Sequence, residues 1–234
     1  MTYRPRTAVV TGASRGLGLA LAEALALGGA AVAMVARTRD PLWAAARAIE
    51  GRGGRVLPID ADVADPASAD RIAAQVHDAF GPVELLVNNA ATLGPTPLPL
   101  LLDLPPDGLE RAFAANVIGP FRLTRRLVGP MVLRGSGLVV AISSDAAVDA
   151  YPTWGAYGAS KAAQDHLHRT FAAELAATGV RFVVVDPGEM DTALHREALP
   201  DADPATLGRP DQVAAALLDA IADAANGARV VLPT

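Results

Sequence analysis

The chain has 234 residues, no cysteine and a formal net charge of −5, and 51% of its residues are hydrophobic. This length and composition fit one globular domain with a sizeable core, and the lack of cysteine excludes disulfides, thiol catalysis and thiolate metal sites. The acidic balance, without any basic run, argues against nucleic acid or an anionic membrane surface as a partner.

The amino-terminal segment passes within a few residues into an apolar stretch and lacks the features of a secretion signal. The longest apolar run, 24–36, contains a Gly-Gly pair and is shorter than the roughly 20 residues that cross a bilayer. We therefore expect a soluble, cytoplasmic protein without a membrane segment.

Apolar runs typical of buried parallel strands alternate with helical patterns along the chain. The predicted strands are 7–11, 31–36, 55–59, 85–88, 138–142, 181–185 and 229–232. The predicted helices are 17–28, 41–50, 67–79, 107–133, 156–178 and 210–225. This alternation indicates right-handed βαβ units, and so an α/β fold with a doubly wound parallel sheet in a single domain, 1–234. The segment 189–208 lacks clear periodicity, and we expect a loop or short helices over a site.

The first strand leads into a glycine-rich turn with the sequence Thr11-Gly12-Ala13-Ser14-Arg15-Gly16-Leu17-Gly18. Glycines allow the backbone to turn tightly and to approach a pyrophosphate at the start of the following helix. An ordinary strand-to-helix turn is the alternative, although three glycines near a helix start cost stability. The turn favours a dinucleotide site.

The second strand ends with Ala36 and Arg37, at a position where enzymes that prefer NAD usually carry a carboxylate for the ribose 2′-hydroxyl. A guanidinium group instead matches a 2′-phosphate, and Arg15 can approach the same group. Both arginines would otherwise be ordinary solvated residues in an arginine-rich chain. We predict that NADP(H) is preferred over NAD(H).

The only lysine of the chain, Lys161, follows Tyr157 by four residues, so both side chains lie on one face of a predicted helix. A neighbouring ammonium favours the phenolate and lowers the tyrosine pKa, which suits proton exchange with a carbonyl oxygen. Ser144 follows the strand 138–142 at the edge of the sheet where ligands bind, and its hydroxyl can polarise the same carbonyl. Ser143 is the weaker candidate, since a shift of one residue turns the side chain away. Taken singly, each motif also fits an ordinary turn or helix start.

Asparagine occurs only four times, and Asn116 interrupts a helical run. Because asparagine is a poor helix former, its position there asks for a reason. Asn116 is either a plain surface residue or one whose amide bends the helix and holds water near the lysine.

In order and spacing these pieces resemble the classical short-chain dehydrogenase/reductase family over nearly the whole chain. The matching pieces are TGASRGLG at 11–18, Asp62-Val63, Asn88-Asn89-Ala90, Asn116, Ser144, Tyr157-x3-Lys161, and Pro187-Gly188 with Thr192. The resemblance implies a single Rossmann-type domain with a seven-stranded parallel sheet in the order 3-2-1-4-5-6-7 and helices on both faces. It also implies a nicotinamide cofactor.

The resemblance further implies a role for each matching residue. Tyr157 would be the general acid in reduction, Lys161 would lower its pKa and hold the nicotinamide ribose, and Ser144 would orient the carbonyl. Asn116 would support a water-linked proton path, which completes the catalytic set. The cofactor-binding residues would be Gly12, Ser14, Arg15, Gly16, Leu17, Gly18, Arg37, Asp62, Val63, Asn89, Ala90, Tyr157, Lys161, Pro187, Gly188, Met190 and Thr192.

We therefore expect an NADP(H)-dependent oxidoreductase that reduces a ketone, aldehyde or dione to an alcohol, reversibly. Substrate contacts would come from 93–98, from 145–154 and from a lid formed by 189–208. A nucleotide-binding sensor or scaffold without turnover is the main alternative, and epimerases or dehydratases with a similar tyrosine and lysine are usually longer. No histidine has metal-ligand spacing, so we expect no metal.

Two features leave the shape of the substrate pocket and the oligomeric state undetermined by the sequence. Ala91 stands where the family commonly has glycine, and the last predicted strand lies close to the end of the sequence. The apolar helices 107–133 and 156–178 resemble those through which the family assembles. We therefore expect a homodimer or homotetramer.

Overall fold

A single parallel sheet of seven strands runs through the computed structural model, which describes residues 2–233. The strand order, β3-β2-β1-β4-β5-β6-β7, confirms the predicted topology. Each predicted strand agrees with an observed one to within a residue at either end. The strands are β1 (Thr7–Thr11), β2 (Ala31–Ala36), β3 (Arg55–Asp60), β4 (Leu85–Asn88), β5 (Gly137–Ile142), β6 (Val180–Asp186) and β7 (Arg229–Val231).

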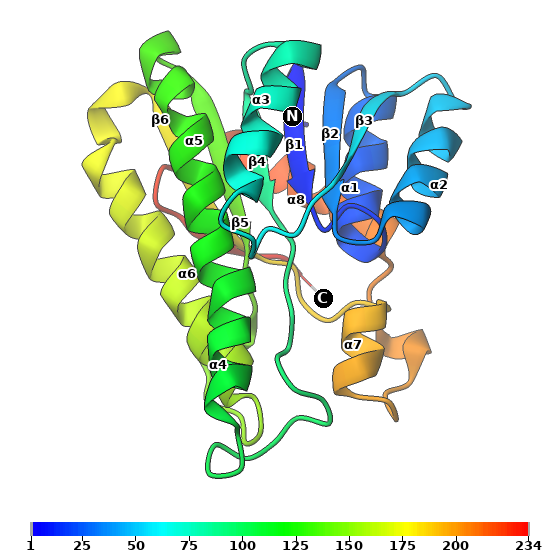
Figure 1. Ribbon diagram of the computed structural model, residues 1–234, viewed down its shortest axis with the longest axis vertical. Coiled ribbons are helices and arrows are strands. Elements are labelled where there is room, and N and C mark those ends of the chain that lie inside the picture. Colours follow the sequence, from blue (N-terminus) through cyan, green and yellow to red (C-terminus); the bar gives the residue numbers. More distant parts are fainter. Residues whose placement is uncertain (1, 234) are drawn as a thin grey trace.

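Helices cover both faces of this sheet (Figure 1). One layer holds α1 (Gly16–Leu27), α2 (Arg39–Glu50) and α8 (Pro210–Asp223). The other holds α3 (Ser68–Phe80), α5 (Gly119–Arg134) and α6 (Gly155–Glu174). The remaining helices, α4 (Pro106–Phe113) and α7 (Ala193–Ala198), lie near the edge at which the strands end. In the described part of the chain, none of the helices has the length and apolar character needed to span a bilayer.

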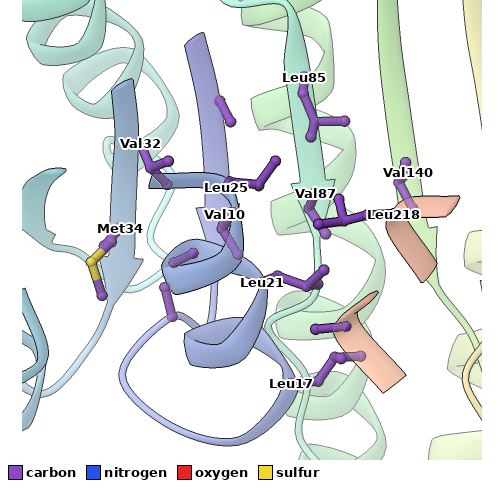
Figure 2. Close-up of a cluster of buried hydrophobic side chains, with 14 of the residues drawn as sticks. Val10, Leu17, Leu21, Leu25, Val32, Met34, Leu85, Val87, Val140 and Leu218 are labelled. Atoms are coloured by element: carbon purple, nitrogen blue, oxygen red, sulfur yellow. The ribbon is translucent and has the colours of Figure 1, made fainter. Parts of the chain in front are cut away.

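The two layers explain why the central strands are apolar without alternation. Every residue of β1 and β2 is buried, because successive side chains point to opposite faces and a helical layer covers each. Val10 therefore packs toward α1, while Val9 packs toward the other layer. Figure 2 shows Leu17, Leu21 and Leu25 of α1, spaced one turn apart, among side chains of the sheet. This packing fixes the start of α1 above the end of β1.

The predicted helix 107–133 is wrong in one respect, because the structure divides it. A π-helical turn, Ala114–Ile118, separates α4 from α5. Asn116 lies in this turn and is fully buried, so the residue that disturbed the helical pattern marks the point where the helix changes its winding. Single π turns inside helices commonly occur at functional sites.

Of the two forms expected for the segment 189–208, a loop or short helices, the structure shows short helices. It contains α7 and a 3₁₀ turn, Pro204–Thr206. A bridge between Met190 and Gly208 joins the two ends of the segment. The segment between β6 and α8 is therefore a loop whose two ends are held together.

Candidate active site

The carboxyl ends of the central strands border one cavity of about 750 Å³. In open parallel sheets, ligands bind at this edge. Every predicted site residue lines the cavity except Gly18 and Asn116. The fold thus brings together segments that extend in sequence from the glycine turn to Thr192.

Two glycines of the turn after β1 adopt backbone conformations that other residues rarely adopt. Gly12 has φ +68° and Gly16 has φ +56°, both in the left-handed region. A Cβ atom at Gly18 would lie 2.4 Å from the carbonyl oxygen of Gly12 and 2.4 Å from Asn89 Nδ2. Gly18 therefore permits close packing of α1 on the turn and does not face the cavity.

A network of hydrogen bonds joins the glycine turn to the turn after β4. The Thr11 hydroxyl accepts hydrogen bonds from the backbone N–H groups of Asn89 and Ala90, at 3.0 Å each. The Asn89 amide donates in return to the Thr11 carbonyl, at 2.8 Å. Both turns border the cavity. The hydrogen bonds hold the two turns together, so a ligand bound in the cavity would contact them as one rigid surface.

Two arginines border the cavity, Arg37 after the end of β2 and Arg15 before the start of α1. Arg15 and Arg37 are exposed, and within residues 2–233 neither forms an ion pair. The nearby Arg39 instead pairs with Asp60 at 3.7 Å. Asp62 also lines the cavity, and its contact with an adenine ring stays a prediction. This end of the cavity therefore offers two unpaired guanidinium groups to an anion.

Helix α6 carries the tyrosine and the lysine side by side. Tyr157 is buried, and Lys161 is only 1% exposed. Lys161 Nζ donates a hydrogen bond of 2.7 Å to the Ile142 carbonyl at the end of β5, and a longer one of 3.4 Å to Gln164. It lies 5.6 Å from the centre of the Tyr157 ring. The predicted arrangement of both groups on one helix face is confirmed.

Burial acts on the pKa of both groups, in opposite directions. It lowers the pKa of Lys161 to about 8, against the attraction of the Asp165 carboxylate. It raises the pKa of Tyr157 above its usual value, and a hydrogen bond with Ser144 offsets only part of that change. The expectation of a lowered tyrosine pKa therefore does not hold for the protein alone, because burial disfavours the phenolate and the nearby carboxylates of Asp186, Asp145 and Asp165 act in the same direction. Tyr157 is a neutral phenol, the form that a proton donor needs.

The two serines after β5 point in different directions, as the alternation of side chains predicts. Ser144 lines the cavity, donates a hydrogen bond of 2.8 Å to Asp145, and is a hydrogen-bond partner of Tyr157. Ser143 also borders the cavity, but it is buried and its hydroxyl donates to Asp165 at 2.8 Å. Ser144 is therefore the serine that a ligand would meet.

Asn116 is not a surface residue, and its amide holds two segments together. It accepts a hydrogen bond from the Thr92 N–H and donates to the Thr92 carbonyl, each at 2.8 Å. It also donates to the Ser160 hydroxyl at 2.9 Å, and Ser160 in turn donates to the Tyr157 carbonyl. Asn116 thus holds the segment after β4 against α6, while the water-linked proton path implied by the resemblance stays a prediction.

Sequence reasoning missed a charged cluster behind the site. Arg229 of β7 donates to the Ser144 carbonyl at 2.9 Å and to Asp186 at 3.0 Å, and it pairs with Asp165 at 3.5 Å. Both carboxylates are buried. The available signal was weak: Arg229 and Asp186 lie in apolar strands, while Asp165 lies among other polar residues of α6.

The wall of the cavity near Tyr157 is largely apolar. Leu93 and Trp154 line it, as do Leu194 and Ala198 of α7, so the segment 189–208 does contribute to the site. His195 of α7 also lines it, and its ring nitrogens make no hydrogen bond within residues 2–233. In the same range, no cluster of three or more His, Asp or Glu side chains is arranged to hold a metal ion.

Comparison with known proteins identifies the family of this chain. The short chain dehydrogenase family matches residues 6–203. A short chain dehydrogenase of Pseudocercospora fijiensis is 39% identical over 194 residues. That alignment covers 81% of this chain and 61% of the fungal protein, so the chain spans less than two thirds of that relative's length.

Two solved structures with bound cofactors share the fold. The L-sorbose reductase of Gluconobacter frateurii, complexed with NADPH and L-sorbose, has a TM-score of 0.86 and 28% identity, with 99% of this chain and 96% of that one covered. A 7α-hydroxysteroid dehydrogenase, complexed with NADH and 7-oxo glycochenodeoxycholic acid, has a TM-score of 0.89 and 26% identity, with coverage of 99% and 94%. The fold therefore accommodates both the phosphorylated and the unphosphorylated cofactor.

The buried lysine predicts a rise in stability with pH. Lys161 has a pKa of about 8 when folded and an ordinary value of 10.5, so between these values the unfolded chain binds more protons and unfolding becomes harder as pH increases. From pH 8 to pH 9.5 the free energy of unfolding of the cofactor-free protein should rise by about 1–2 kcal/mol. Urea titrations at constant ionic strength measure this change.

Lys161→Met is the matched control, because it removes the only lysine of the chain. The variant should lose the rise. Curves of equal slope for the two proteins would show that Lys161 titrates as a solvated group.

Proposed function

This chain belongs to the short-chain dehydrogenase family, which makes it an oxidoreductase of CH–OH and C=O groups, and we propose that it is an NADP(H)-dependent carbonyl reductase. It would reduce a ketone, aldehyde or dione to the alcohol and catalyse the reverse reaction. The observation that carries this proposal is the presence of Ser144, Tyr157 and Lys161 in one cavity with the glycine turn.

The chemistry divides between cofactor and protein. When bound, the reduced nicotinamide would supply the hydride that adds to the carbonyl carbon. Tyr157 gives its hydroxyl proton to the carbonyl oxygen, which takes up the electron pair of the broken C=O π bond. The ammonium of Lys161 stabilises the phenolate that remains. Ser144 contacts the same oxygen through its hydroxyl and holds it near the Tyr157 hydroxyl.

The residues of the cavity fit a dinucleotide along its length. The positive φ values of Gly12 and Gly16 leave backbone without side chains at the start of α1, where a pyrophosphate would bind. Thr192 lies next to this turn, since a Cβ atom at Gly16 would be 3.3 Å from its methyl group. Asp62 and Lys161 both line the cavity, and the family resemblance puts adenosine toward Asp62 and nicotinamide toward Lys161.

The end of β2 supports a preference for the phosphorylated cofactor. Its last residue, Ala36, supplies no carboxylate for a ribose 2′-hydroxyl. Arg37 follows it and Arg15 borders the same cavity, and a pair of guanidinium groups suits a 2′-phosphate. We place the 2′-phosphate between them.

The substrate chamber supports a mainly apolar carbonyl compound of modest size. Leu93, Trp154 and Leu194 provide apolar walls, while Asp145 and Tyr151 bond to each other beside them. The segment 189–208 would act as the lid, because α7 supplies one wall and the bridge between Met190 and Gly208 ties its ends.

We also propose that the chain assembles as a homodimer or homotetramer through α5 and α6. Leu133 of α5 is 90% accessible, and Ile118, the residue before the first residue of α5, is 40% accessible. Covering such apolar side chains would favour association. A cytoplasmic location stays a prediction from the sequence.

Replacing Tyr157 with phenylalanine separates a reductase from a sensor. Tyr157→Phe removes the proton donor and little else, so turnover of NADPH with a panel of ketones, aldehydes and diones should fall by about 10²–10⁴-fold. Nucleotide affinity, measured by fluorescence titration, should change little. If the wild-type protein binds NADPH but turns over no carbonyl compound that the panel contains, the sensor alternative gains support.

Replacing Arg37 tests the cofactor preference. Arg37→Ala should lower kcat/KM for NADPH by about 10–100-fold, the cost of one charge-assisted contact, and should leave NADH almost unaffected. Arg39→Ala is the matched control, since Arg39 is a nearby exposed arginine already paired with Asp60. An equal effect of Arg37→Ala on both nucleotides would contradict a 2′-phosphate contact.

A further inference from the structure

One guanidinium group connects three of the segments that build the site. Arg229 enters from β7, whose pairing with β6 puts it opposite Val184. Its Nη2 donates to the Ser144 carbonyl at 2.9 Å and to Asp186 Oδ2 at 3.0 Å. Its Nε lies 3.5 Å from Asp165 Oδ2. The partners of Arg229 are thus the end of β5, the end of β6 and helix α6.

Each of these partners holds a group that the proposed reaction uses. The hydroxyl of Ser144 would contact the carbonyl oxygen of the substrate. Asp186 accepts a hydrogen bond from the Gly188 N–H at 3.2 Å, which shapes the turn expected beside the nicotinamide. Asp165 lies one helical turn after Lys161. A displacement of Arg229 would therefore shift the serine, this turn and the lysine-bearing helix relative to one another.

The charges of this cluster balance in a place with little water. The side chains of Asp165 and Asp186 are 8% and 7% exposed, and that of Arg229 is 26% exposed. Lys161 supplies a second cation, so two cations face two anions. Asp165 attracts both Lys161 and Arg229, and the carboxylate is therefore shared between a catalytic cation and a structural one.

We propose that Arg229 is a positioning residue for the active site, which fixes the Ser144 carbonyl and limits the attraction that Asp165 exerts on Lys161. Arg229 touches neither the substrate nor the reacting atoms in this arrangement. Its catalytic consequence rests on the proposed reductase function, while its effect on Lys161 does not.

Several groups face Lys161, and all of them bear on the test. The helix α6 itself supplies Tyr157, Asp165 and His168, and the neutral Gln164. The strand ends supply the Ile142 carbonyl, Asp186 and Arg229, and Asp145 follows β5. Among these charged groups, Arg229 is the cation that neutralises the two buried carboxylates. Its removal should leave the attraction of Asp165 on Lys161 stronger.

The lone lysine makes a direct measurement possible. Lysine labelled with ¹³C at Cε gives one side-chain NMR signal in this chain, and its chemical shift against pH reports the titration of Lys161. In Arg229→Gln the midpoint should rise by about one pH unit, because an opposite charge left without its partner favours the ammonium. An unchanged midpoint would overturn the electrostatic half of the proposal.

Arg229→Lys separates charge from geometry, and it also serves if the glutamine variant fails to fold. A lysine keeps the positive charge but cannot reach three acceptors with one planar group. The Lys161 midpoint should stay close to that of the wild type, while kcat for carbonyl reduction should fall about tenfold, with little change in KM for the carbonyl substrate. Wild-type kcat in this variant would overturn the positioning role.

Arg181→Gln is the matched control. Arg181 lies on β6 near its opposite end and donates to the Ala224 carbonyl, so this variant also loses one charge and one bond to a backbone carbonyl. It should leave both the Lys161 midpoint and kcat unchanged. If wild-type protein reduces no carbonyl compound, the proposed function fails, yet the NMR titrations of these variants still decide whether Arg229 acts on Lys161.

Discussion

A single buried ammonium group determines how the active site is built. Removing the charge of Lys161 from water is costly unless hydrogen bonds and a nearby anion compensate for lost hydration. The Ile142 carbonyl and the Asp165 carboxylate provide that compensation. Because one partner ends β5 and the other belongs to α6, satisfying the lysine fixes the helix on the strand. Tyr157, on the preceding turn of α6, then lies beside Ser144.

The other half of the cavity depends on backbone contacts instead of charge. Glycines at 12 and 18 let the turn after β1, the start of α1 and the turn after β4 approach more closely than side chains would permit. The Thr11 hydroxyl then joins the two turns through hydrogen bonds. Because all strands are parallel, both halves open on the same edge of the sheet. A dinucleotide laid across this edge would reach from Arg37 to Lys161.

The sequence predicted the parts of this arrangement that depend on short-range patterns. Continuous apolar runs identified the strands because both faces of the sheet are covered, and motifs at strand ends identified most of the cavity. The π turn at Ala114–Ile118 was not predicted, because its Asn116 is bonded to Thr92, a contact between residues 24 positions apart that helical periodicity does not reveal. Arg229 was missed for the same reason, since its bond to Ser144 joins residues 85 positions apart. The raised pKa of Tyr157 depends on burial, which spacing along a helix does not reveal.

The two cations of the site explain why a chain with nineteen arginines keeps one lysine. Arginine stays charged at every physiological pH and bonds several acceptors with one rigid plane. It suits a permanent anchor such as Arg229, whose partners are two buried carboxylates and a carbonyl. Lysine is a compact charge whose pKa responds to burial, and at about 8 it lies close to neutrality. Exchanging the two would put a point charge where one planar group bonds three acceptors, and a rigid planar group where the site holds a compact ammonium.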